Sequence, residues 1–110
     1  MDEYEIKITR QAQEQLQQII RHIAQELKAP ATAQKWLTKL EKRILSLSVF
    51  PGRVALTEEE PWHSQGVHKL VEGNFLIYFW IDEAAKVVQV TAVIYGRRDQ
   101  MRQLNAMEWE

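Results

Sequence analysis

The candidate side chains of this sequence for proton transfer or phosphate binding lie between residues 53 and 98. Cleaving an RNA backbone without a metal requires a base for the 2′-hydroxyl, an acid for the leaving oxygen and cations around the phosphate. His63, His68 and Tyr95 are the candidates for proton transfer, and the candidate cations are Arg53, Lys69, Arg97 and Arg98. Strands that end at the same edge of a sheet would bring four of these residues together: His68, Lys69, Arg97 and Arg98.

The same residues also have explanations that involve no chemistry. The Arg97-Arg98-Asp99 stretch would serve equally well as a solvated strand end, where an ion pair contributes about 0–1 kcal/mol. His68 lies between Val67 and Lys69 in an expected strand, a position typical of a structural or exposed histidine. His63 and His68 have no third ligand nearby, so we predict no metal site and no cofactor.

Periodicity predicts the elements of the first half. Tyr4, Ile6 and Ile8 alternate with charged residues, which is typical of a half-buried strand. Thr9 is then a candidate N-cap of a helix that reaches about residue 27, where Pro30 would end it. A second amphipathic helix is predicted from about residue 31 to residue 47. Because the connection is short, the two helices should form an antiparallel hairpin.

The second half reads as an irregular stretch followed by three strands. Residues 53–66 have no clear period, and strands are predicted over 67–72, 75–81 and 87–95, with a Gly73-Asn74 turn after the first. The expected architecture is α+β in the order β-α-α-β-β-β, with the helical hairpin packed on an antiparallel sheet. We expect one domain over 1–99 and a short C-terminal tail over 100–110.

The central predicted strand is apolar on both faces. Phe75, Ile77, Phe79 and Ile81 point to one side, and Leu76, Tyr78 and Trp80 point to the other. One set should pack under the helical hairpin. The other set needs cover from the irregular stretch, from the C-terminal segment or from a partner protein, because a contiguous apolar face is rarely left in water.

Composition excludes several classes of protein. The chain of 110 residues has no cysteine, which excludes disulfides, thiolate metal sites and cysteine nucleophiles. Its N-terminus is acidic and no stretch of about 18 apolar residues occurs, so we expect neither a signal peptide nor a membrane span but a cytoplasmic protein. The net charge of −1 disfavours non-specific binding to nucleic acid.

Several stretches together resemble one protein family. A β-branched run that leads into Ile94-Tyr95-Gly96-Arg97-Arg98-Asp99 resembles the C-terminal signature of the RelE/ParE superfamily, the toxins of type II toxin–antitoxin modules. Residues 4–9 resemble the opening strand of that family, Phe50-Pro51-Gly52-Arg53 its turn after the helices, and residues 66–82 its central hairpin. The order and spacing of these stretches carry the resemblance, which covers roughly residues 4–99.

The resemblance implies the same α+β fold and a growth inhibitor held inactive by an antitoxin encoded alongside it, with which it would form a hetero-oligomer. RelE-like members cleave messenger RNA in the ribosomal A site, whereas ParE-like members poison DNA gyrase and are not known to be nucleases. RelE-like members usually have an arginine where this sequence has Leu76, and a tyrosine or histidine in the region of residues 100–104, which has neither. These departures favour the ParE-like branch.

The ParE-like interpretation predicts a protein that acts by contact rather than as an enzyme. Target contacts would be made by Arg53, Tyr95, Arg97 and Arg98, and the antitoxin would contact the face made by Leu76, Tyr78 and Trp80, because aromatic patches are frequent at interfaces. One alternative is a RelE-like messenger RNA endoribonuclease that uses His68, Lys69, Arg97 and Arg98. A second alternative is an inactive toxin fold that only binds its antitoxin.

Overall fold

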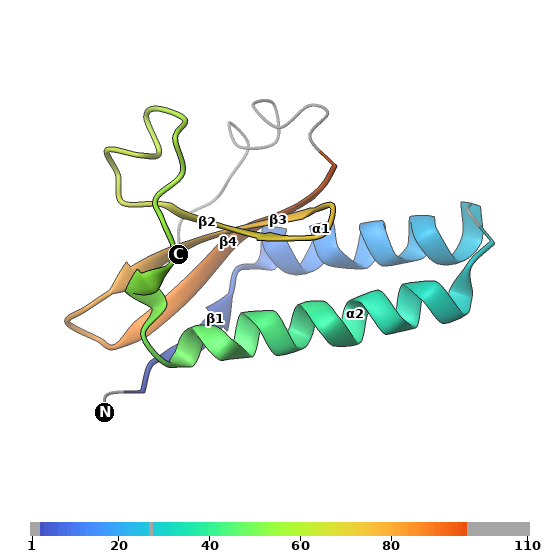
Figure 1. Ribbon diagram of the computed structural model, residues 1–110, viewed down its shortest axis with the longest axis horizontal. Coiled ribbons are helices and arrows are strands. Elements are labelled where there is room, and N and C mark those ends of the chain that lie inside the picture. Colours follow the sequence, from blue (N-terminus) through green and yellow to red (C-terminus); the bar gives the residue numbers. More distant parts are fainter. Residues whose placement is uncertain (1–2, 27, 97–110) are drawn as a thin grey trace.

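A four-stranded sheet carries two long helices on one of its faces in the computed structural model, which describes residues 3–26 and 28–96 (Figure 1). The elements follow the predicted β-α-α-β-β-β order, and three short helical turns occur between them. Their bounds along the chain are β1 (Glu5–Ile8), α1 (Arg10–Arg21), the π-helical turn η1 (His22–Glu26), α2 (Pro30–Leu45), the 3-10 turns η2 (Ser46–Ser48) and η3 (Pro51–Arg53), β2 (His68–Glu72), β3 (Phe75–Asp82) and β4 (Val87–Tyr95).

The sheet is mixed rather than wholly antiparallel. Its strand order is β1-β4-β3-β2; β2, β3 and β4 pair antiparallel, but β1 pairs parallel with β4, from Glu5 opposite Val87 to Ile8 opposite Val90. The two antiparallel helices return the chain to the end of the sheet where β1 starts, and the Tyr4 amide donates to the Ser48 carbonyl there at 2.8 Å. Two hairpins then make β4 run in the same direction as β1.

Local chemistry explains where the helices begin. Thr9 is the N-cap of α1, and its Oγ1 accepts a hydrogen bond from the Ala12 amide at 3.2 Å, as the sequence predicts. Pro30 was expected to end the first helix and instead begins α2, because the fixed φ of proline suits the first helical position. Lys28, with φ +50°, makes the reversal between the two helices.

The two faces of β3 pack into two separate apolar clusters, as the alternation predicts. Phe75, Ile77 and Phe79 lie in the larger cluster under α1 and α2. Leu76 and Tyr78 lie in a smaller one with Trp62, Val67, Ala92 and Ile94. The cover of this second face therefore includes the irregular stretch, which Figure 1 shows on the side of the sheet away from the helices. Among the described residues, no helix has the length and apolar character needed to cross a membrane.

Candidate functional site

His68 is held by contacts inside the protein. Its Nδ1 lies 2.7 Å from the Val54 carbonyl oxygen, and its ring stacks on Phe79 with centroids 4.9 Å apart and planes 8° apart. One ring nitrogen and one ring face are thus engaged in fixing the irregular stretch to the start of β2. This is the structural role that the sequence offered as the alternative to catalysis.

Lys69 and His63 also make contacts that hold the irregular stretch, residues 54–67, in place. The Lys69 Nζ atom lies 3.2 Å from Glu59 Oε1, and both side chains are largely shielded from solvent. The Thr57 hydroxyl donates to the other oxygen of Glu59, and Nδ1 of His63 lies 2.8 Å from the Thr57 carbonyl oxygen. The Lys69–Glu59 pair therefore anchors residues 54–67 on β2, and the His63 contact joins two parts of that stretch to each other.

Strand direction separates His68 from the end of β4. His68 pairs with Phe79, whereas Tyr95 pairs with Phe75, which lies four residues earlier in β3. Because a strand rises about 3.3 Å per residue, this register corresponds to about 13 Å. The predicted cluster of His68, Lys69, Arg97 and Arg98 requires the start of β2 to lie level with the end of β4. Because β2 and β4 run parallel, the described part of the chain does not meet this requirement. Arg97 and Arg98 lie outside the described residues.

Arg53 supports the backbone at the end of the helical hairpin. Its Nη1 atom donates to the carbonyl oxygens of Val49 at 2.5 Å and Phe50 at 2.9 Å, and its Nη2 atom donates to Ser46 Oγ at 3.1 Å. Phe50 has φ +49°, a left-handed conformation that is unfavourable for a residue with a side chain, and the guanidinium group contacts the carbonyl groups on both sides of it. The structure thus gives the predicted target residue Arg53 a supporting role.

Two of the three residues predicted to contact an antitoxin are buried. Leu76 is 4% exposed and Tyr78 is 0% exposed, whereas Trp80 is half-buried. A side chain at Gly66 would begin 3.8 Å from the Trp80 ring, so the irregular stretch also lies close to that residue. Direct contact of an antitoxin with Leu76 and Tyr78 would require this cover to move. The assignment of that face stays a prediction.

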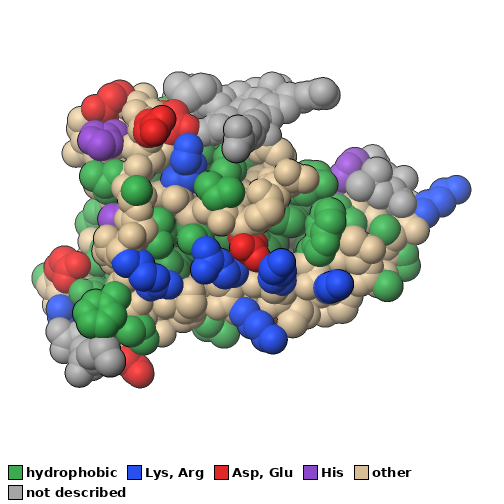
Figure 2. All heavy atoms as spheres, viewed as in Figure 1, with side chains coloured by type: hydrophobic (Ala, Val, Ile, Leu, Met, Phe, Trp, Pro, Cys, Tyr) green, Lys and Arg blue, Asp and Glu red, His purple; other side chains and the backbone are tan. Residues whose placement is uncertain are grey.

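The structure reveals two surface features that the sequence analysis did not predict. One is an apolar groove of about 550 Å³ between α1, η1, α2 and the end of β1, with Leu16, Ile20, Ala24 and Leu37 among its lining residues. The other is a row of cationic side chains along α2, which Figure 2 shows as blue spheres. Its members, hereafter the α2 basic row, are Lys35, Lys39, Lys42 and Arg43. Their helical spacing was a signal available in the sequence.

The Glu59 carboxylate makes the stability of the irregular stretch depend on pH. Burial raises the pKa of Glu59, but hydrogen bonds from Thr57 and Lys69 outweigh burial and hold that pKa below its ordinary value. A carboxylate with a lowered pKa stabilises the fold above its unfolded-state pKa, about 4.3, and loses this contribution as the pH falls through the folded-state pKa. Glu59→Gln should thus lower the free energy of unfolding at pH 7 by up to about 1 kcal/mol.

Urea unfolding at pH 7 and at pH 3 would measure this contribution. The difference between wild type and Glu59→Gln should shrink at the lower pH, because the unfolded state binds a proton there and the contribution of the lowered pKa is progressively lost. Glu58→Gln changes an exposed neighbouring carboxylate and is the control, with little expected effect at either pH. A Glu59→Gln difference that is equal at both pH values would contradict the role assigned to the charge.

Described residues 3–26 and 28–96 thus form an α+β domain without a group of three His, Asp or Glu side chains that could hold a metal ion. A family model described as "ParE toxin of type II toxin-antitoxin system, parDE" matches residues 6–100. The chain therefore belongs to the ParE toxin family of type II toxin–antitoxin systems. No curated protein matches the sequence.

Two solved structures share the fold. A chain of the chromosomal ParDE toxin–antitoxin system from P. aeruginosa is 23% identical with a TM-score of 0.70, and the match covers 86% of this chain and 97% of that one. A chain of the RelBE2 toxin–antitoxin complex from Mycobacterium tuberculosis is 19% identical with a TM-score of 0.62, with coverage of 86% and 93%. At these identities the likeness concerns the fold, which agrees with the α+β prediction.

Proposed function

We propose that this chain inhibits growth by poisoning DNA gyrase, and that a cognate antitoxin encoded alongside it holds it inactive. The match of residues 6–100 to the ParE family model carries the proposal. ParE-like toxins are the branch of the superfamily that acts on gyrase, whereas RelE-like toxins act on messenger RNA at the ribosome. The names of the two similar structures, a toxin–antitoxin system and a toxin–antitoxin complex, support the antitoxin as partner.

The geometry around His68 supports a protein target over RNA cleavage. A general base must have a ring nitrogen within hydrogen-bonding reach of the proton that it removes. Nδ1 of His68 donates to the Val54 carbonyl, which leaves Nε2 as the one nitrogen that could act as a base. One face of the ring lies against Phe79, and the neighbouring cation Lys69 is already paired with Glu59. A phosphate would have to compete with Glu59 for this lysine.

The groove between α1 and α2 is the antitoxin surface that we favour over the buried face of Leu76 and Tyr78. Its half-buried apolar side chains, Leu16, Ile20, Ala24 and Leu37, need no rearrangement to be contacted. A groove of this kind suits an amphipathic helix, which lays its apolar side into it at helical spacing. The resulting complex would be a toxin–antitoxin hetero-oligomer.

Controlled expression in growing cells tests the proposed target. Pulse labelling should show that protein synthesis continues at first while a DNA-damage response appears, and the purified chain should make gyrase accumulate cleaved DNA. The matched variant His68→Gln keeps a side chain able to reach the Val54 carbonyl and should inhibit growth as strongly as wild type. Immediate arrest of protein synthesis, abolished by His68→Gln, would establish the RelE-like alternative. A folded chain without any effect on growth would establish the second alternative, an inactive toxin fold that only binds its antitoxin.

A further inference from the structure

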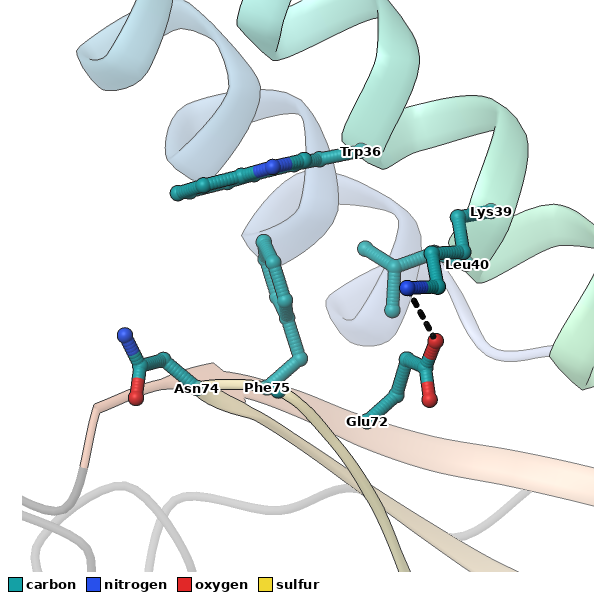
Figure 3. A pocket seen from close by; sticks show the side chains of 7 residues that line it. Trp36, Lys39, Leu40, Glu72, Asn74 and Phe75 are labelled. Carbon is teal, nitrogen blue, oxygen red and sulfur yellow. Dashed lines mark ion pairs between the residues drawn. The ribbon is translucent and has the colours of Figure 1, made fainter.

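A pocket of about 200 Å³ lies between α2 and the turn that joins β2 to β3. Trp36 and Phe75 form its aromatic wall in an edge-to-face arrangement, with ring centroids 5.8 Å apart and planes 87° apart. Figure 3 shows Asn74 on one side of Phe75 and the Lys39–Glu72 ion pair on the other. Leu40 and Phe75, which are 1% and 4% exposed, form the floor of this small hollow, and the half-buried Trp36 forms its side.

The size of the pocket limits what can enter it. Pockets for small molecules and cofactors usually measure about 300–1,000 Å³. A volume of about 200 Å³ suits one large apolar side chain, the kind of anchor that dominates the energy of many protein interfaces. The walls are held in place from behind, because Phe75 also packs on Tyr95, with ring centroids 5.0 Å apart.

The rim of the pocket carries positive charge. Glu72 lies 3.6 Å from Lys39 Nζ and 3.4 Å from Arg43 Nε, so two cations flank one carboxylate. Lys39 remains 71% exposed at its side chain despite this pair. The other members of the α2 basic row, Lys35 and Lys42, are exposed, and Glu41 is the one acidic residue of α2. Since residues four apart on a helix are neighbours about 6 Å apart, the cations extend as a continuous strip from the pocket.

We infer that this pocket docks an acidic segment of a partner polypeptide, which places one large apolar side chain against Trp36, over the floor made by Leu40 and Phe75, and lays Asp or Glu side chains along the α2 basic row. This interaction surface goes beyond the proposed function, because it requires neither gyrase as the target nor the groove between α1 and α2. The combination of an apolar anchor site with a cationic rim is what such a segment complements.

The same features argue against other occupants. A nucleic-acid backbone has no apolar group to fill the pocket, and the Glu72 carboxylate within the cationic rim would repel its regularly spaced phosphates. A peptide can place its acidic side chains beside Lys35 and Lys39, while its amides donate to Glu72. A second copy docked symmetrically would bring two basic rows together, which like-charge repulsion opposes.

Anisotropy of a labelled synthetic peptide, titrated with the full chain, tests the inference. The probe is a 12-residue peptide with one leucine flanked by glutamates, and two matched peptides replace either the leucine by serine or the glutamates by lysines. The leucine peptide should bind at least about tenfold more tightly than the serine peptide, a difference of about 1.4 kcal/mol, and the lysine peptide should not bind. The indole resonance of Trp36 should shift on binding, whereas that of Trp62, in the other cluster, should not.

Charge variants locate the contact without disturbing the core. Lys35→Glu with Lys39→Glu changes two exposed residues of the α2 basic row and should lower the affinity for the leucine peptide by about tenfold or more. The control, Lys7→Glu, makes the same kind of change on β1, the opposite edge strand of the sheet, and should leave affinity within about twofold. Equal binding of the leucine and serine peptides, tighter binding of a 12-base-pair DNA duplex, or self-association that involves Trp36 would each overturn the inference.

Discussion

Replacing Phe79 by alanine is expected to lower the free energy of unfolding by about 3–5 kcal/mol. Phe79 is fully buried in the cluster beneath the helices, and its ring also supports His68. The truncation would remove buried apolar surface and leave a cavity that the central strand of a sheet cannot readily close. Because a domain of this size has a total stability of about 5–15 kcal/mol, the loss is a large fraction of it.

Urea unfolding followed by circular dichroism would measure the effect of Phe79→Ala, and the melting temperature should fall by on the order of 10–20 °C. Phe50→Ala is the matched control, because it makes the same change at a side chain that is 62% exposed. Its effect should stay within about 0.5 kcal/mol. Comparable losses for the two variants would show that Phe79 contributes no more than a surface residue.

Replacing both Arg97 and Arg98 by alanine is expected to abolish growth inhibition while antitoxin binding is retained. The two arginines follow directly after Gly96 at the end of β4 and lie outside the described residues, so this expectation rests on the sequence and the family resemblance. Guanidinium groups pair with carboxylate or phosphate through two parallel hydrogen bonds, and alanine offers none. Colony counts after induction, with and without the antitoxin, would measure the effect.

Lys7→Ala with Arg10→Ala is a matched control for that experiment, since it removes two exposed cations, from β1 and the start of α1, that do not line the groove between α1 and α2. The control should remain fully inhibitory, and both double variants should show the circular dichroism of the wild-type fold. Persistent inhibition by the Arg97 and Arg98 variant would show that the contacts to the target lie elsewhere on the protein.

Much of the fold could be predicted from patterns that depend on neighbouring residues. The alternation of Phe75 and Leu76 along β3 indicates two buried faces, and the oxygen of Thr9 satisfies an amide of the next helical turn. Both patterns express local geometry: side chains alternate across a strand, and the first amides of a helix need acceptors. The parallel pairing of β1 with β4 could not be predicted in this way, because it joins residues about 80 positions apart.

The candidate site was less predictable for the same reason. His68, Lys69 and Arg53 have the side chains that chemistry at a phosphate would need, but their partners in the fold are Val54, Glu59 and carbonyl groups near Phe50. The sequence identifies which polar side chains the protein has, but it does not reveal the hydrogen bonds and ion pairs that these side chains make in the folded chain. The pocket at Trp36 was missed because its walls come from a helix and a turn that are separated by more than 30 residues.

By itself, the sequence determined the class of this protein: an α+β domain with the motifs of the RelE/ParE superfamily, without thiol chemistry and with apolar residues on both faces of its central strand. Only the tertiary structure decided which of its polar side chains are engaged in contacts within the protein. The register and the direction of β2 place His68 away from the end of β4, and the ordering of residues 54–67 over the sheet engages both His63 and Lys69. Such pairings depend on contacts between distant segments, and these form only when the chain has folded.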